Sequence, residues 1–140
     1  MNTPALSGVL ETVLYYTSEE ESFEFYSNVM GFRSIGREPG RSMFFRAGES
    51  VFLLFNAEAT SKGGMLPPHG AAGPGHTCFQ VHETDYVSWK DHLVERGIEI
   101  IQEVTWPLGS TGEEVRGRSF YFHDPSGNVL EIADSDFWGR

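Results

Sequence analysis

The sequence predicts an α+β fold built from two similar modules, each with the order strand, helix and then three strands. The prediction rests on an internal repeat. Residues 10–55 and residues 75–132 each open with a short apolar strand, run into an amphipathic helix and end in three further strands. The closest match between the halves joins Arg41–Arg46 to Arg118–His123. A repeat of this length is a whole supersecondary unit, so it indicates the fold before any residue is considered for chemistry.

The first module, residues 8–56, carries clear helix boundaries. Ser18 begins the helix, Glu21 follows in the position of a capping box, and Gly31 ends the helix. The side chains at helical spacing that form its buried face are Phe23, Tyr26 and Met30. The expected elements are a strand at 9–16, a helix at 18–30 and strands at 32–38, 41–47 and 50–56.

A linker rich in glycine and proline, residues 57–74, leads to the second module, residues 75–133. The expected elements there are a strand at 75–82, a helix at 84–96 and strands at 98–105, 116–123 and 128–133. A tail, residues 134–140, follows, and Phe137 and Trp138 predict that it docks on the protein. A chain of 140 residues is expected to form a single domain with one core.

Composition excludes several classes of function. The net charge of −10 and the scattered basic residues argue against nucleic acid as a partner, because binding to phosphates needs clusters of Lys and Arg. No apolar run approaches the length of a membrane span, and the first residues lack the pattern of a signal peptide. Cys78 is the only cysteine, so no disulfide can form within the chain. We therefore expect a cytoplasmic protein that does not bind membranes.

Three polar side chains interrupt strands that are otherwise apolar. Glu11 and His76 occupy the same place in the opening strands of the two modules, and Glu131 lies in the last strand. A carboxylate inside an apolar strand is costly to bury without a partner. Two such carboxylates and an imidazole that converge on one point predict a divalent cation, which supplies the missing charge. An open face of the cation then polarises a substrate oxygen or activates water.

Simpler interpretations of these residues stay open. A single histidine in a strand is more often a hydrogen-bonded structural residue than a ligand, and a glutamate in an antiparallel sheet usually faces solvent. Arg118 is equally compatible with a salt bridge on the sheet surface and with a cavity position where it holds an anionic group.

Three segments resemble the vicinal oxygen chelate superfamily, which includes glyoxalase I, extradiol dioxygenases, fosfomycin-resistance enzymes and bleomycin-resistance proteins. The segments are Phe25–Tyr26 followed by Val29–Phe32, then Gly75–Val81, and Phe122–Ile132, of which the last (FHDPSGNVLEI) is the most specific. The resemblance extends from about residue 8 to residue 133. It implies two βαβββ modules that form a curved eight-stranded mixed sheet around a shared cleft, and a homodimer.

The resemblance also implies the metal ligands, which the family takes from the first and last strands of its modules. Carried over by position, they are Glu11, His76 and Glu131. The remaining position falls near Leu53 and is apolar, unlike in glyoxalase I, which uses four protein ligands. Glu11 departs from the ring-cleaving and fosfomycin enzymes, where a histidine is usual at this place.

These observations lead to a metal-dependent enzyme that acts on a small oxygen-bearing organic substrate, as a lyase, isomerase or dioxygenase. The metal is Fe, Mn, Zn or Ni, and Glu11 or Glu131 is the candidate general base. The alternative is a metal-free protein that sequesters a small molecule, as bleomycin-resistance proteins do. The candidate walls of the substrate cavity are Tyr15, Phe44, Phe55, Trp106, Arg118 and Tyr121.

Overall fold

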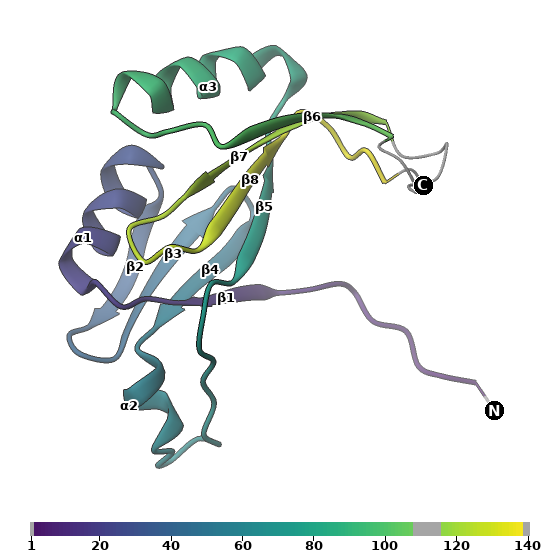
Figure 1. Ribbon diagram of the computed structural model, residues 1–140. Coiled ribbons are helices and arrows are strands. Elements are labelled where there is room, and N and C mark those ends of the chain that lie inside the picture. The colour runs from purple at the N-terminus through teal and green to yellow at the C-terminus, as the bar shows by residue number, and fades with distance from the viewer. Residues whose placement is uncertain (1, 108–115, 139–140) are drawn as a thin grey trace.

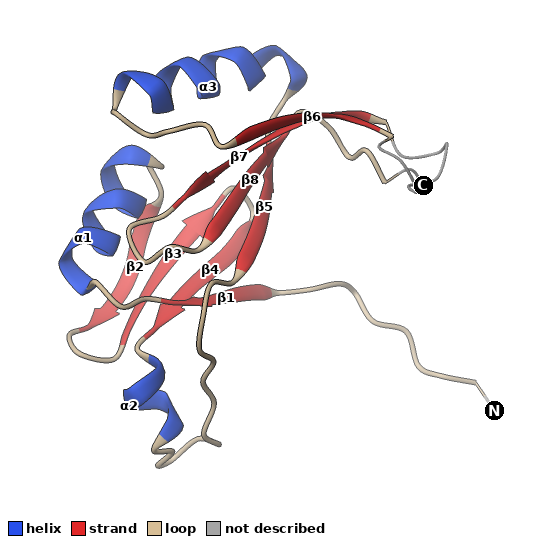
Figure 2. Cartoon of the chain, in the orientation of Figure 1, coloured by secondary structure: helices blue, strands red, loops and turns tan. Residues whose placement is uncertain are grey.

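The structure is a computed structural model that describes residues 2–107 and 116–138. It contains the two predicted βαβββ modules (Figure 1 and Figure 2). The elements of the first module are β1 (Glu11–Tyr15), α1 (Glu19–Glu24) continued by a π-helical segment (Phe25–Val29), β2 (Arg33–Glu38), β3 (Ser42–Ala47) and β4 (Ser50–Phe55). The elements that follow are α2 (Ala57–Ser61), β5 (His76–Gln80), a 3₁₀ turn (Glu83–Asp85), α3 (Tyr86–Glu95), β6 (Gln102–Trp106), β7 (Gly117–His123) and β8 (Val129–Ala133).

The described strands form two four-stranded mixed sheets, in the orders β1-β4-β3-β2 and β5-β8-β7-β6. In each sheet the first strand of the module runs parallel to the last, and the other pairs are antiparallel. The α+β class is therefore confirmed. The sheets are separate: the edge strands β1 and β5 contact each other but do not join the strands into one continuous sheet.

The register of the two sheets confirms the internal repeat. Glu11 pairs with Val51 in the first sheet, as His76 pairs with Val129 in the second. By the same count, Leu53 takes the place in the first sheet that Glu131 takes in the second. The equivalence expected from the sequence is thus reproduced by the hydrogen-bonded pairing.

One hydrophobic core joins the two modules. It lies against the face of each sheet that packs on α1 or α3, which we call the helix face, and it leaves the opposite, open faces without a helix. Tyr26 and Leu93, on the expected inner faces of the helices, are fully buried, while Phe23 and Trp89 are half-buried against the core. The rings of Phe25 and Phe122, from different modules, lie 6.5 Å apart.

A turn of the second module, whose Asp124 and Asn128 side chains are buried, fixes the first module to it. Asp124 Oδ2 accepts a hydrogen bond of 2.6 Å from the Tyr26 hydroxyl and one of 2.9 Å from Asn128 Nδ2. Its Oδ1 accepts from the backbone N–H groups of Ser126 and Asn128, both at 2.9 Å. Burial, followed by the Asp124 carboxylate, raises the pKa of Tyr26 well above its ordinary value, so this hydroxyl remains a donor.

The capping box expected at Ser18 is wrong. Ser18 is the N-cap of α1, but its side chain makes no capping hydrogen bond. The hydroxyl of Ser126 accepts instead from the backbone N–H groups of Thr17 and Ser18. The second module therefore binds the N–H groups of the two residues just before α1, which no local sequence pattern could indicate.

The linker is more ordered than its composition predicts, because it contains α2, capped by the side chain of Asn56. Thr60 in this helix is buried, and its hydroxyl donates to the backbone carbonyl of His69 at 2.6 Å. At the other end of the chain, Phe137 is buried against Trp106, so the described part of the tail docks as predicted. Residues 139–140 of the tail lie outside the described part. Among the described helices, none is long and apolar enough to cross a bilayer.

Candidate functional site

The open face of the second sheet carries the strongest candidate site. Cys78, Glu131 and Tyr121 lie side by side in neighbouring strands, because β8 pairs with β5 on one side and with β7 on the other. His76 stands two residues before Cys78 on β5, and it therefore points to the same face. The strand pairing thus brings His76 and Glu131, two of the three predicted ligands, together.

Hydrogen bonding fixes the ring of His76. Its Nδ1 donates to the carbonyl of Val129 at 2.9 Å, and its ring lies over that of Tyr121 at a centroid distance of 6.1 Å. The Nε2 atom then faces Glu131, 3.2 Å from Oε1. A backbone carbonyl that holds one ring nitrogen while the other points into a site is the usual arrangement of a metal-binding histidine.

Glu131 is deeply buried, with 4% of its surface exposed. Its Oε2 atom makes no hydrogen bond of normal geometry, although the carboxylate is close enough to the Cys78 thiol and the Tyr121 hydroxyl to raise the pKa of both. Because Nδ1 of His76 donates to a backbone carbonyl, Nε2 is the ring nitrogen that faces the carboxylate. A cation bound between Nε2 and the carboxylate would compensate the buried charge.

The geometry fits a cation. Two atoms that bind one metal ion at about 2.0–2.2 Å, at right angles to each other, are separated by roughly 3 Å. The separation of 3.2 Å between His76 Nε2 and Glu131 Oε1 agrees with that value. The unpaired Oε2 of Glu131 offers a further acceptor at the same place. One imidazole and one carboxylate form a donor set suited to Fe²⁺, Mn²⁺, Zn²⁺ or Ni²⁺.

Glu11 does not join these two residues within one copy of the chain. It is exposed on the open face of the first sheet, whereas the buried Leu14 of the same strand points to the helix face. Among the residues that the structure describes, no group of three or more His, Cys, Asp or Glu side chains is placed to hold a metal ion. The expectation that Glu11, His76 and Glu131 converge in a single chain is therefore not met. The reason is that the modules share a core through their helix faces, and their open faces belong to separate sheets.

The predicted cavity walls divide between the two open faces. Trp106 and Tyr121 line a pocket of about 420 Å³ together with His76 and Glu131. The residues on the first sheet are Tyr15, Phe44 and Phe55. There the rings of Phe44 and Phe55 lie 6.0 Å apart, edge to face.

Arg118 is not a wall of this pocket, which corrects the cavity interpretation. It lies on the helix face of β7, the same face as the buried Phe120, whereas Ser119 between them points to the open face. Its Nε donates to Asp134 Oδ2 at 2.8 Å, and its guanidinium lies 4.3 Å from the centre of the Tyr86 ring on α3. The salt-bridge alternative is the one that the structure supports.

Sequence reasoning missed several residues of the two open faces. His69 of the linker lies on the first sheet, where its Nδ1 is 2.7 Å from the Tyr15 hydroxyl. Phe137 and Trp138 of the tail, together with Cys78, line the pocket that contains Glu131. Desolvation, followed by the Glu131 carboxylate, raises the pKa of the Cys78 thiol to about 12, so this group is no thiolate nucleophile at neutral pH. The aromatic character of the tail hinted at Phe137 and Trp138, and strand alternation alone places Cys78 on the same face as His76.

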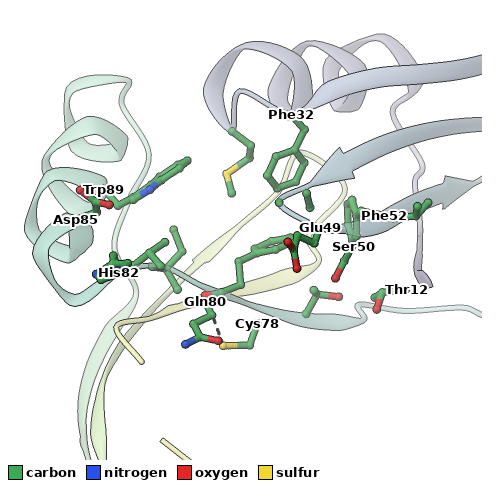
Figure 3. Close-up of a pocket in the computed structure, with 18 residues that line it drawn as sticks. Thr12, Phe32, Glu49, Ser50, Phe52, Cys78, Gln80, His82, Asp85 and Trp89 are labelled. Carbon is green, nitrogen blue, oxygen red and sulfur yellow. Dashed lines mark hydrogen bonds between the residues drawn. The ribbon is translucent and has the colours of Figure 1, made fainter. Parts of the chain in front are cut away.

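A larger cavity, of about 600 Å³, lies between the modules (Figure 3). Phe32, Phe52 and Trp89 are among its walls, and Glu49 and Asp85 lie exposed at its rim. Size alone does not make it the better candidate, because none of the three predicted ligands lines it and its carboxylates are solvated. The smaller pocket holds a buried carboxylate with an unpaired oxygen, which is the stronger chemical indication.

Comparisons with known proteins agree with this fold. The family model of the Glyoxalase/Bleomycin resistance protein/Dioxygenase superfamily matches residues 8–132. The crystal structure of lactoylglutathione lyase from Agrobacterium tumefaciens has a TM-score of 0.86 and 30% identity, and the match covers 96% of this chain and 98% of that one. A manganese complex of a fosfomycin-resistance protein from Listeria monocytogenes is similar in fold alone, with a TM-score of 0.66 and 17% identity over 94% of this chain and 92% of that one.

A comparison of sequences also finds a relative with a glyoxalase name. Glyoxylase I 4 of Arabidopsis thaliana is 30% identical over 125 residues, which make up 85% of this chain. The match spans only 66% of that relative's length. Since the family model covers nearly all of this chain, the chain belongs to the Glyoxalase/Bleomycin resistance protein/Dioxygenase superfamily.

Proposed function

We propose that this protein is a metal-dependent enzyme of the glyoxalase type, acting on a small organic molecule through oxygens that chelate a divalent metal. One observation carries the proposal: the buried carboxylate of Glu131 has an unpaired oxygen and lies beside a histidine whose ring is already oriented. A buried carboxylate without compensation is costly, and such sites are kept where they serve chemistry.

The third ligand, Glu11, comes in this proposal from a second copy of the chain. Glu11 is exposed on an open face that has Leu53 where the other sheet has Glu131. Neither open face is therefore complete alone: one offers a single carboxylate, and the other offers His76 and Glu131. Apolar side chains beside Glu11, including Leu10 and Val13, are also exposed and available for contact. A two-fold homodimer that brings unlike open faces together forms two equal sites.

The bound metal would supply a positive charge for the chelated oxygens and for the negative charge that develops on them. The protein's own contribution is to hold the metal ligands in place and to orient their side chains. The Val129 carbonyl fixes the His76 ring, and the neighbouring strands β5 and β7 hold the buried Glu131 in place. Tyr121, whose pKa is raised by burial and then by the Glu131 carboxylate, stays a neutral hydroxyl beside the substrate. Glu11, the more exposed carboxylate, is suited to accept a proton from the substrate.

The substrate class follows from the relatives and stays part of the proposal. A lactoylglutathione lyase is 30% identical in sequence, so a hemithioacetal formed from an α-ketoaldehyde and glutathione is the first substrate to test. The metal candidates remain Fe, Mn, Zn and Ni, and we propose a cytoplasmic location.

Metal content and turnover test the proposal together. Protein refolded or dialysed with Mn²⁺, Zn²⁺ or Ni²⁺ is expected to retain about one metal ion per chain and to convert the methylglyoxal–glutathione hemithioacetal, with catechol and fosfomycin as further substrates. Chelation by EDTA should abolish turnover, and the metal should restore it. Protein that binds none of these metals, and Fe²⁺ neither, would contradict the proposal.

The competing function is metal-free sequestration of a small molecule. It is favoured by the aromatic rings of Trp106, Phe137 and Trp138, which line the same pocket. Tight binding of a planar compound by the EDTA-treated protein, without turnover and without metal uptake, would support this function.

A further inference from the structure

We propose that the C-terminal tail forms a binding face for a planar aromatic group of the substrate, with Trp138 as its outer surface. This inference rests on the proposed function and adds to it the class of substrate: a small molecule with chelating oxygens at one end and an aryl group at the other. Chelating oxygens would lie toward Glu131, and the aryl group toward Trp138.

The tail presents a stack of three rings to the pocket. The rings of Trp106 and Phe137 are nearly parallel, at 6° and 5.5 Å between centroids. The ring of Trp138 also lies beside that of Phe137, at 29° and 5.7 Å between centroids. Phe137 is buried within the stack, whereas Trp138 is 69% exposed. An exposed indole at the end of an ordered stack offers its face to another ring.

The tail is anchored at the base of this stack. Arg116 N donates to the carbonyl of Phe137 at 2.8 Å, and the side chain of Asp134 is held by Arg118. A Cβ atom at Gly117 would meet Phe137 Cβ at 3.0 Å and Asp134 Oδ1 at 2.9 Å, so the tail lies directly on the backbone of β7. Phe137 is therefore held in place by several contacts, and the neighbouring Trp138 is positioned through it.

The ring stack and the candidate metal ligands line one pocket. His76, Tyr121 and Glu131 form another part of the wall of this cavity of about 420 Å³, a size usual for small ligands. The rings of His76 and Tyr121 are themselves stacked, at 30°. The unpaired oxygen of the buried Glu131 indicates that this pocket is built for a ligand.

The charge of the lining indicates which aryl group fits. The described lining contains the carboxylates Glu131 and Asp136 but neither lysine nor arginine. An aryl group without a charged substituent is therefore favoured over one that carries a carboxylate. Stacking on an indole is the dominant attraction that this part of the pocket can offer.

Two metal chelators that differ only in this group test the inference. Benzohydroxamate and acetohydroxamate offer the same pair of oxygens, but only the first has a phenyl ring. Their affinities are to be measured by titration calorimetry for Mn²⁺-loaded and metal-free protein, in the wild type and in the Trp138→Ala, Trp138→Phe and Trp89→Phe variants. Trp89 lines the other cavity and serves as the matched control.

The wild type is expected to bind benzohydroxamate about tenfold more tightly than acetohydroxamate, because of the ring contact. Trp138→Ala should reduce that ratio to below about threefold, while Trp138→Phe and Trp89→Phe should preserve most of it. A ratio near one in the wild type, or a ratio unchanged in Trp138→Ala, overturns the inference. If the proposed metal site does not exist, the affinity for acetohydroxamate will be the same with and without Mn²⁺. This result is separate from the ratio between the two chelators, which tests the ring contact.

Discussion

Replacing His76 with alanine is expected to lower the metal affinity at least about a hundredfold while leaving the fold intact. The ring supplies the nitrogen that faces Glu131, and its loss leaves that carboxylate without its neighbour. The side chain is 49% exposed, so its removal opens no cavity in the core. Metal binding is to be followed by calorimetry with Mn²⁺ and Zn²⁺, and the fold by circular dichroism and by the midpoint of thermal unfolding.

His82→Ala is the matched control. His82 is exposed, follows the same strand and has no part in the pocket that contains Glu131. Its replacement should leave metal affinity within about twofold of the wild type, as surface substitutions usually do. Equal metal binding by the His76→Ala variant and the wild type would show that His76 is a structural residue only.

The second large effect concerns stability. Asp124→Ala is expected to lower the free energy of unfolding by about 3–5 kcal/mol, because a buried charged acceptor is removed and its donors remain. Those donors are the Tyr26 hydroxyl, the Asn128 amide and the two backbone N–H groups of the turn. Urea unfolding monitored by circular dichroism measures the change.

Asp91→Ala, on the exposed side of α3, is the control for Asp124 and should change the free energy of unfolding by less than about 0.5 kcal/mol. Asp124→Asn keeps one acceptor oxygen and should fall between the two. If Asp124→Ala costs less than about 1 kcal/mol, the turn does not hold the modules together in the way that its hydrogen bonds indicate.

Much of the fold was predictable because the sequence repeats a pattern that physics imposes locally. Alternating apolar residues place Leu14 and Phe52 on a buried face, and helical spacing does the same for Tyr26. The segment from Asp124 to Gly127 carries Pro and Gly where a type I turn prefers them, and the hydrogen bond from Gly127 N to the Asp124 carbonyl closes such a turn. Element boundaries differ most at β6, which begins at Gln102, four residues after the expected start at residue 98.

The site was only partly predictable, because alternation along a strand tells which residues share a face and not where that face points. His76 and Glu131 come together since β5 and β8 are neighbours in one sheet. Glu11 follows the same alternation but belongs to the other sheet. Arg118 was ambiguous in the sequence, and only the nearby Asp134 and Tyr86 place it on the helix face. The docking of Phe137 depends on long-range contacts with Trp106 that no local pattern encodes.

The central claim is that Glu11 of one copy completes the metal site of another, and mixing two inactive variants tests it most directly. Glu11→Ala and His76→Ala are each expected to lose the metal as separate proteins. When they are co-expressed in equal amounts, half of the randomly formed dimers pair the two variants, and each of these has one complete site. The account predicts about a quarter of the wild-type metal content, with a matching recovery of turnover. Metal content no higher than that of the separate variants, or full metal binding by Glu11→Ala alone, would contradict it.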